Sequence, residues 1–200
     1  MNRSYLWVWV VFFTCAICVS IPAMAGEPTE IVRKTTDKII AILTDPSLEG
    51  PEKVGERKGL VREAVSEQFN RREMSRRTLA RHWRKRTEEE KKEFIELYGK
   101  LLEQTYLDRV EGYSGEKVFY EGEEVDGKYG VVKVKILTEQ QTEIAVEYRL
   151  KKASDDWLVY DVSIEGVSLV NNYRNQFNSI IVRSSYKEFT KKLKAKVEEP

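Results

Sequence analysis

The hydrophobic residues of this chain recur at helical spacing up to about residue 116 and alternate with polar residues from Lys117 onward. A period near 3.6 predicts amphipathic helices, and a period of two predicts strands with one buried face. The first helix should end at Asp45-Pro46, because the residue before a proline disfavours the helical conformation. A second helix should follow the turn at Gly50-Pro51. The longest should run from about Thr87 to Val110, where Thr87 and Glu90 have the spacing of a capping box.

Four strands are expected in the second half of the chain, around residues 118–120, 132–136, 144–150 and 158–164. Asp126-Gly127 is a typical hairpin signal between the first two. Short turns between consecutive strands predict an antiparallel meander with one apolar and one solvated face. In the last strand, alternation assigns Leu158, Tyr160, Val162 and Ile164 to the apolar face and Asp161, Ser163 and Glu165 to the other.

Helices that precede a run of strands favour an α+β fold rather than alternating units. A further helix begins after Gly166, with Val170, Tyr173 and Phe177 at helical spacing. The helices are the only material that can cover the apolar face of the sheet. No repeat or linker interrupts residues 26–200, so we expect one domain there. The lysine-rich segment after Phe189 is expected to form a solvated final helix that frays by Glu198.

Residues 1–25 have the pattern of a secretory signal peptide. Arg3 precedes an apolar run, and Ala23-Met24-Ala25 gives the small-residue cleavage pattern, so we expect cleavage after Ala25. The alternative is a membrane anchor, but the run from Leu6 to Ile21 has about 16 residues against the ~20 that a spanning helix needs. Both cysteines of the chain lie in this segment, so residues 26–200 contain neither disulfides nor thiolate chemistry.

Charge and composition narrow the classes of function. Removal of residues 1–25 takes away Arg3 and no acidic residue, which leaves 33 of the 34 basic side chains against 33 acidic ones. This balance argues against a nucleic-acid-binding protein, which typically has a strong basic excess. The chain has one histidine, His82, and it has no nucleophile elbow, glycine-rich phosphate loop or metal-ligand spacing. We therefore expect no catalytic residues, no metal site and no cofactor.

The densest charge feature is the segment 71–86, in which eight of sixteen residues are basic and one is acidic. Met74, Leu79 and Trp83 are spaced to face inward while the arginines face outward. Such a surface could contact anionic lipid head groups, dock an acidic partner or be attracted to a membrane. It could equally be a solvated helix face that pairs with the acidic residues Glu88 to Glu90. The candidate docking residues are Arg71, Arg72, Arg76, Arg77, Arg81 and Arg84.

Two blocks of sequence resemble the MlaC family of phospholipid carriers, also called the toluene-tolerance family. The first is REMSRRTLARHW, followed by LLEQTY. The second comprises GEKVFY, YRL and YDVSIEGVSLVNNYRNQF. The residues of these blocks resemble the family, and so do the order and the spacing of the blocks along the chain. The chain departs from the family at Asn70-Arg71, where Asp-Phe is usual, and at Ala80, where glycine is usual.

The resemblance implies a periplasmic, non-enzymatic carrier that moves phospholipid between an outer-membrane lipoprotein complex and an inner-membrane ABC transporter, and so maintains outer-membrane lipid asymmetry. It implies a monomeric NTF2/cystatin-like cone whose sheet and helices surround a hollow apolar pocket. Mapping that fold onto the strand pattern gives the candidate lipid-binding residues Met74, Leu79, Trp83, Leu101, Val132, Val134, Val146, Tyr148, Val162, Ile164 and Tyr173.

Two other classes of function remain open at this point. An adaptor or solute-binding protein would have a filled core and act through the arginine-rich segment. A small enzyme on the same cone would need an acidic side chain with a raised pKa in its pocket. Periodicity alone does not separate a filled core from a hollow one.

Overall fold

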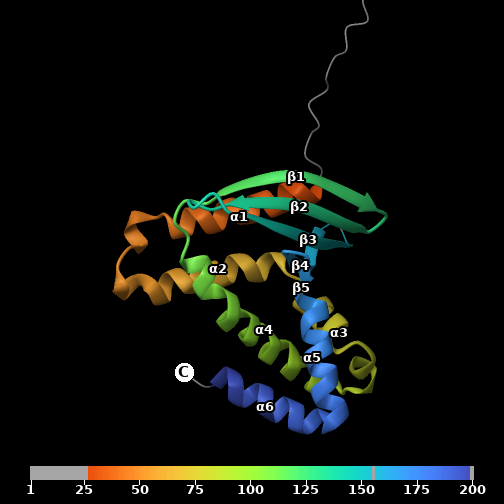
Figure 1. The fold of residues 1–200 in the computed structure, drawn as a ribbon. Helices are drawn as coiled ribbons and strands as arrows, with labels where there is room; N and C mark the ends of the chain where they lie inside the picture. The colour runs from red at the N-terminus through yellow and green to blue at the C-terminus, as the bar shows by residue number, and fades with distance from the viewer. Residues whose placement is uncertain (1–26, 155, 199–200) are drawn as a thin grey trace, which may run out of the picture.

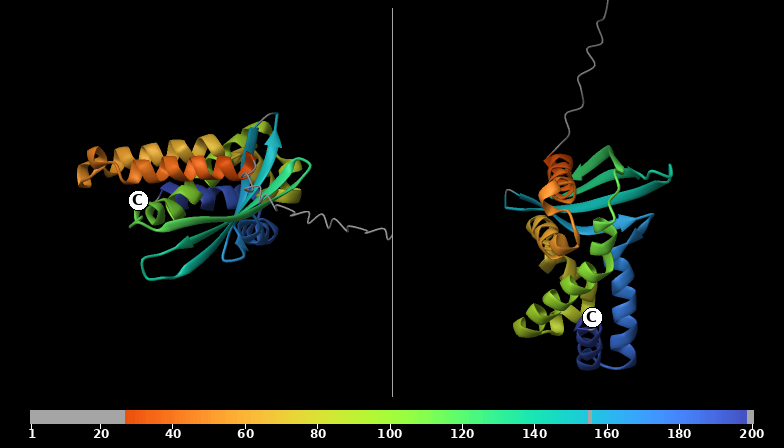
Figure 2. Two further views of the ribbon diagram at one scale, coloured as in Figure 1. Left: turned by 90° about the horizontal axis from the view of Figure 1, so that it is seen from above. Right: turned by 90° about the vertical axis from the view of Figure 1, so that its left-hand side faces the viewer.

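The computed structural model describes residues 27–154 and 156–198, and the expected signal peptide at residues 1–25 lies outside them. Helix α1 packs on one face of the sheet, and helices α3 to α6 form a second body on the far side of α2 (Figure 1). Turning the molecule shows α1 and α2 lying side by side (Figure 2). The α-helices are α1 Glu27–Leu43, α2 Val54–Gln68, α3 Arg71–Leu79, α4 Glu88–Glu111, α5 Leu169–Arg183 and α6 Tyr186–Glu198.

The helix boundaries follow local signals in the sequence. Three short 3-10 helices, Pro46–Leu48, Pro51–Lys53 and Ala80–Lys85, connect the longer helices. The expected capping box opens α4, where the Thr87 hydroxyl accepts from the Glu90 N–H and the Glu90 carboxylate accepts from the Thr87 N–H. The side chain of Asn70 caps α3 by accepting from the Glu73 N–H at 2.9 Å. Asn70 therefore caps this helix at a position where the MlaC family usually has aspartate.

The second half forms the predicted antiparallel meander. Its strands are β1 Lys117–Asp126, β2 Tyr129–Leu137, β3 Glu143–Ala153, β4 Asp156–Ile164 and the short β5 Val167–Ser168, in the order β1-β2-β3-β4-β5. Asp126 pairs with Tyr129, so the predicted hairpin turn is present. The α+β fold class expected from the order of periodicities is confirmed.

The face assignment in the last strand was partly wrong, because β4 contains a bulge. Arg149 pairs with Asp161 while Leu150 pairs with Val159, so Tyr160 is an extra residue in the ladder. Val162 therefore shares the apolar face with Val159 rather than with Tyr160. Tyr160 instead packs against the helical body, where the Arg77 guanidinium lies 3.9 Å from its ring centroid.

The apolar side chains form two separate clusters. The sheet cluster lies between the inner face of the sheet and α1, where Val32, Val132 and Leu150 are buried. The helical cluster lies among α3 to α6 and is centred on Phe94, which is fully buried. Phe69, at the junction of α2 and α3, packs against both. The core is thus divided between the two bodies of the molecule.

The lysines of the final helix had indicated a solvated helix, but one face of it is buried. Phe189, Leu193 and Val197 of α6 are buried in the helical cluster, and the Gln104 side chain of α4 donates to the Val197 carbonyl at 3.1 Å. The lysines lie on the opposite, exposed face of the helix. The amphipathic period, rather than the charge, decided how this segment packs.

Glu73 ties the helical body to the sheet. Its carboxylate is almost buried and accepts from Arg76 at 2.7 and 2.8 Å, from Arg77 at 3.0 Å and from Lys151 of β3 at 3.3 Å. The hydrogen bonds from Arg76, followed by those from Arg77 and Lys151, outweigh burial and lower the pKa of Glu73 to about 2. Next to it, the Asn70 N–H donates to the Val159 carbonyl of β4 at 2.8 Å.

Replacing Glu73 by glutamine should destabilise the protein at neutral pH. A pKa of about 2 against the usual 4.5 corresponds to about 3 kcal/mol, which solvent screening at the half-exposed Arg76 reduces to about 2 kcal/mol. Because the folded pKa is lowered, the contribution is complete above pH 4.5 and is lost as the pH falls toward 2. Denaturant unfolding at several pH values should show the wild type and Glu73→Gln converging in acid.

The control for this experiment is Glu96→Gln, which changes an exposed glutamate of α4. It should alter the free energy of unfolding by less than about 0.5 kcal/mol. A Glu73→Gln variant as stable as this control at pH 7 would contradict the assignment.

Ala80 has a strained backbone at the abrupt end of α3. Its φ is 46° and its ψ is −117°, a conformation that side chains with a Cβ rarely adopt. The family usually has glycine at this position. The strained geometry lets the chain leave α3 and enter the following 3-10 helix without a longer loop.

Ala80→Gly should stabilise the protein by about 1 kcal/mol, since the relieved strain of about 1–3 kcal/mol exceeds the added freedom of glycine in the unfolded chain. The measurement is the midpoint and slope of denaturant unfolding. The same change at Ala41, an exposed residue inside α1, should instead destabilise by about 1 kcal/mol. If both variants changed the free energy of unfolding in the same direction, the strain at Ala80 would be ruled out.

Candidate functional site

The inner face of the sheet is apolar but only partly covered by protein. Around the buried valines of the sheet cluster lie apolar side chains that remain partly accessible, contributed by β1 to β4 and by the first residue of α5. These are Val118, Tyr120, Ile136, Ile144, Tyr148, Ile164 and Leu169. A contiguous apolar surface of this kind is typical of a binding site for an apolar ligand.

Tyr148 of β3 belongs to this partly accessible set. Burial, with a smaller contribution from the nearby Tyr120, raises the pKa of Tyr148 to about 12. Part of the side chain nevertheless remains accessible. Tyr148 is therefore largely removed from water and still has surface that an apolar ligand could contact.

Tyr120 continues this surface on β1. Its hydroxyl is buried and has no hydrogen-bond partner within residues 27–154 and 156–198. The Arg33 guanidinium of α1 lies 4.1 Å from the centroid of its ring. Burial raises the pKa of Tyr120, so the phenol stays protonated at neutral pH. The hydroxyl lies near Thr36 and charged side chains of α1, so it faces the helix that packs on the sheet.

Helix α1 closes one end of this surface by packing tightly on the sheet. The Thr29 N–H and hydroxyl donate to the Glu123 carboxylate of β1 at 3.0 and 2.6 Å. The Trp157 indole N–H donates to Glu27 at 3.0 Å. A Cβ on Gly130 would lie 3.2 Å from Trp157 and 3.3 Å from Pro28, so glycine allows the close approach. This end of the sheet is filled, and the accessible residues lie towards the other.

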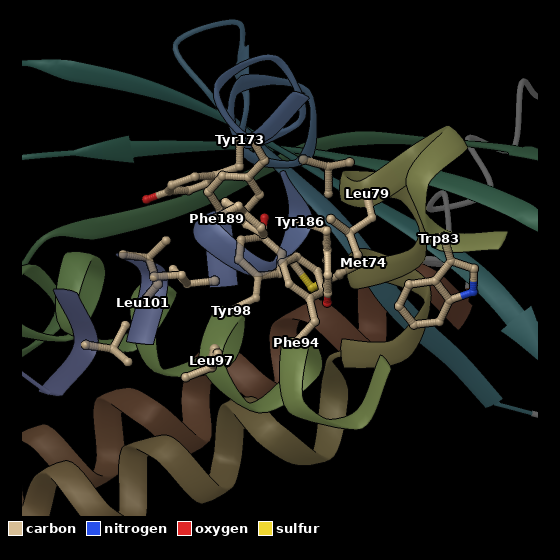
Figure 3. Close-up of a cluster of buried hydrophobic side chains, with 14 residues drawn as sticks. Met74, Leu79, Trp83, Phe94, Leu97, Tyr98, Leu101, Tyr173, Tyr186 and Phe189 are labelled. Carbon is tan, nitrogen blue, oxygen red and sulfur yellow. The ribbon is translucent and has the colours of Figure 1, made fainter. Parts of the chain in front are cut away.

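The helical cluster, by contrast, is densely packed (Figure 3). Phe94 stacks on Tyr98 with ring centroids 5.5 Å apart, and Phe177 lies 4.8 Å from Phe189. Trp83 lies at one end of the cluster and Leu101 at the other. This body forms a filled core rather than a cavity wall.

The eleven residues predicted to bind lipid fall into the two clusters. Tyr148 and Ile164 belong to the accessible sheet face. Val132, Val134, Val146 and Val162 share that face but are buried. The remaining five pack into the helical cluster: they are Met74, Leu79, Trp83, Leu101 and Tyr173.

The six arginines predicted to dock a partner are held differently. Arg76 and Arg77 bind Glu73. Arg72 pairs with Glu88 at 3.1 Å, which agrees with the alternative that this helix face pairs with the acidic residues Glu88 to Glu90. Arg81 donates to Asn178 of α5 at 2.9 Å. Among the residues that the structure describes, the guanidinium groups of Arg71 and Arg84 have no hydrogen-bond or ion-pair partner.

Sequence reasoning missed two polar residues of structural importance. Asp161 was assigned to the solvated face, but it is 4% exposed. Its carboxylate accepts from the Ser168 hydroxyl at 2.6 Å and from the Val170 N–H at 3.0 Å. It therefore caps α5 from β4. Arg174 of α5 donates to the Arg77 carbonyl at 2.8 Å and so joins the basic segment from a distant part of the sequence.

The described part of the chain offers little for catalysis or metal binding. No group of three or more His, Cys, Asp or Glu side chains in it could hold a metal ion. The His82 Nε2 lies 2.9 Å from the Asn178 side-chain oxygen, so the ring serves a structural contact between the 3-10 helix and α5. Among residues 27–154 and 156–198, none of the helices has the length and apolar character needed to cross a membrane.

Comparisons with known proteins agree with the fold. A family model described as "MlaC protein" matches residues 33–195. The chain is 21% identical over 209 residues to the intermembrane phospholipid transport system binding protein MlaC of Haemophilus influenzae, covering 100% of this chain and 98% of that protein. It also superposes on a phospholipid-binding protein from Ralstonia solanacearum, solved in complex with a phospholipid. The TM-score is 0.75 and the identity 23%, over 87% of this chain and 100% of the other.

Enlarging Tyr148 tests whether its accessible part borders unfilled space. Tyr148→Trp adds volume to a side chain that is only partly covered, so the free energy of unfolding should change by less than about 1 kcal/mol. Phe94→Trp makes a comparable enlargement in the filled helical cluster, where overpacking should cost about 1–3 kcal/mol. Denaturant unfolding of both variants provides the comparison. A loss at Tyr148 as large as that at Phe94 would show that the sheet side is filled too.

Proposed function

The chain belongs to the MlaC family, and on that premise we propose that it binds a phospholipid and carries it between membranes. The relatives support this assignment, because one is described as a phospholipid transport binding protein and another was solved with a phospholipid bound. In this proposal the acyl chains lie against the accessible residues of the inner sheet face. The observation that carries it is the set of partly accessible apolar side chains on the inner sheet face, Tyr148 among them.

The proposed acyl-chain site is built from apolar residues of four strands together with Leu169 of α5. The phenols of Tyr120 and Tyr148 are its polar groups, and both have raised pKa values because they are buried. A neutral phenol can donate a hydrogen bond to an ester oxygen without bringing a charge into an apolar space. The arrangement suits a ligand with long apolar chains and few polar atoms at this depth.

The energetics of such a ligand constrain how it leaves. Burial of acyl chain is worth about 0.8 kcal/mol per CH₂, so two long chains give a gross term above about 20 kcal/mol. Measured affinities saturate near that value after the costs of binding. Spontaneous release into water would therefore be very slow. We infer that cargo leaves when a partner offers a continuous apolar path.

The cellular setting of the proposal follows the family. The carrier would act in the periplasm after cleavage behind Ala25, between an outer-membrane lipoprotein complex and an inner-membrane ABC transporter. Its work would maintain the lipid asymmetry of the outer membrane. It would act as a monomer, with phospholipid as cargo rather than as a cofactor.

An enzymatic role on the same fold has less support. An enzyme of this kind would need a pocket carboxylate with a raised pKa. In the described part of the chain, the carboxylates with a displaced pKa have it lowered, by hydrogen bonds or by neighbouring cations. The adaptor alternative, with a filled core, is separated from the carrier by the experiment below.

Organic extraction and mass spectrometry test the proposal directly. Protein purified from the periplasm without detergent should contain phospholipid in stoichiometric amount, because release into water is slow. Tyr148→Trp should reduce that content while the protein stays folded, as judged by circular dichroism. The control is the same extraction after unfolding and refolding in lipid-free buffer, which should give an empty protein. A well-folded protein without lipid at first purification would favour the adaptor.

A further inference from the structure

A basic groove lies at the junction of α3, the following 3-10 helix and α5, outside the proposed lipid site. It has a volume of about 630 Å³, and its sides carry five arginines: Arg76, Arg77, Arg81, Arg84 and Arg174. Helices α3 and α5 run side by side here (Figure 1). Four of the five arginines come from the basic segment 71–86, and Arg174 comes from α5, almost a hundred residues later in the chain.

Most of these guanidinium groups are held in place by the protein. Glu73 binds Arg76 at 2.7 Å and Arg77 at 3.0 Å. Arg174 is fixed by its hydrogen bond to the Arg77 carbonyl, and Arg81 by its bond to Asn178. Side chains held in this way lose little conformational entropy when a ligand binds. Their remaining N–H donors are available to an incoming anion.

The charge of the groove is strongly unbalanced. No carboxylate is among the residues that line it. Glu73, which binds Arg76 and Arg77, is almost buried, and its low pKa keeps it ionised at neutral pH. The exposed Arg84 has no anionic partner in the part of the chain that the structure describes. The groove therefore concentrates positive charge that the protein itself does not neutralise.

The two uncharged residues that line the groove are Ala80, which is exposed, and Trp83, whose side chain is 7% exposed and is anchored in the helical cluster. A side chain buried to this extent cannot insert into a bilayer as a surface anchor would. A small apolar area among fixed guanidinium forks instead suits carboxylate side chains on a narrow, partly apolar segment.

We propose that this groove is the docking site for an acidic segment of a partner protein. The proposal rests on the proposed function, since a carrier must be recognised by the complexes that load and unload it. Four of the six arginines predicted from the sequence belong to the site, Arg71 and Arg72 do not, and Arg174 is added to it. Docking would place the partner on α5, whose first residue, Leu169, lies at the proposed lipid surface.

Fluorescence anisotropy with a labelled amphipathic peptide tests this site. The peptide carries glutamates along one helical face and leucines along the other, and its counterpart has glutamine in place of glutamate. The glutamate peptide should bind, the glutamine peptide should not, and added salt should weaken the binding. Arg81→Ala/Arg84→Ala should bind about tenfold more weakly. Lys191→Ala/Lys192→Ala, which removes the same charge from the exposed face of α6, should bind as the wild type does.

Two further measurements distinguish the other outcomes. Sedimentation with phosphatidylglycerol vesicles should show no difference between the arginine and lysine double variants. If the arginine double variant lost vesicle binding and the lysine double variant kept it, the proposal would be overturned in favour of a membrane contact. The phospholipid content of the arginine variant should equal that of the wild type. Loss of lipid would instead assign the groove to the cargo site, and failure of the glutamate peptide to bind would also overturn the proposal.

Discussion

The stacking of Phe94 on Tyr98 and the contact of both rings with Phe177, at centroid distances of 5.5–6.0 Å, form the centre of the helical cluster. Large aromatic side chains packed in this way contribute much of the apolar burial of a small domain. Their packing is what allows the inner sheet face to remain partly uncovered, because a sheet with an accessible apolar face gains less from its own burial. A binding surface for an apolar ligand and a stable fold are thus supplied by different parts of one domain.

The sequence predicted those features that depend on neighbouring residues. The change of period at Lys117, the capping box at Thr87 and the hairpin at Asp126-Gly127 are local, and each is present in the structure. The bulge at Tyr160 was not predictable, because it arises from the pairing with β3 and leaves no mark on the hydrophobic pattern. The alternation was therefore correct at Val162 and wrong at Leu158 and Tyr160.

The candidate sites show the same limit. Strand parity placed Tyr148 and Ile164 correctly on the inner face. It could not show that Leu79 and Trp83 pack within a separate helical body, because that depends on how α3 docks against α4 and α5. The burial of Asp161 and the position of Arg174 both depend on α5 returning to β4 and α3. A charge run in the sequence indicated a basic surface, but the groove is completed by a residue from another helix.

The capping of α5 by Asp161 has a mechanical consequence. One carboxylate on β4 binds both the Ser168 hydroxyl and the Val170 N–H, so it ties the first turn of α5 to the sheet. Leu169, in the same turn, packs against the sheet cluster, and Arg174 lies about 7.5 Å further along the helix axis. A tilt of α5 about its first turn would therefore displace Arg174 in the groove several times further than Leu169 at the sheet.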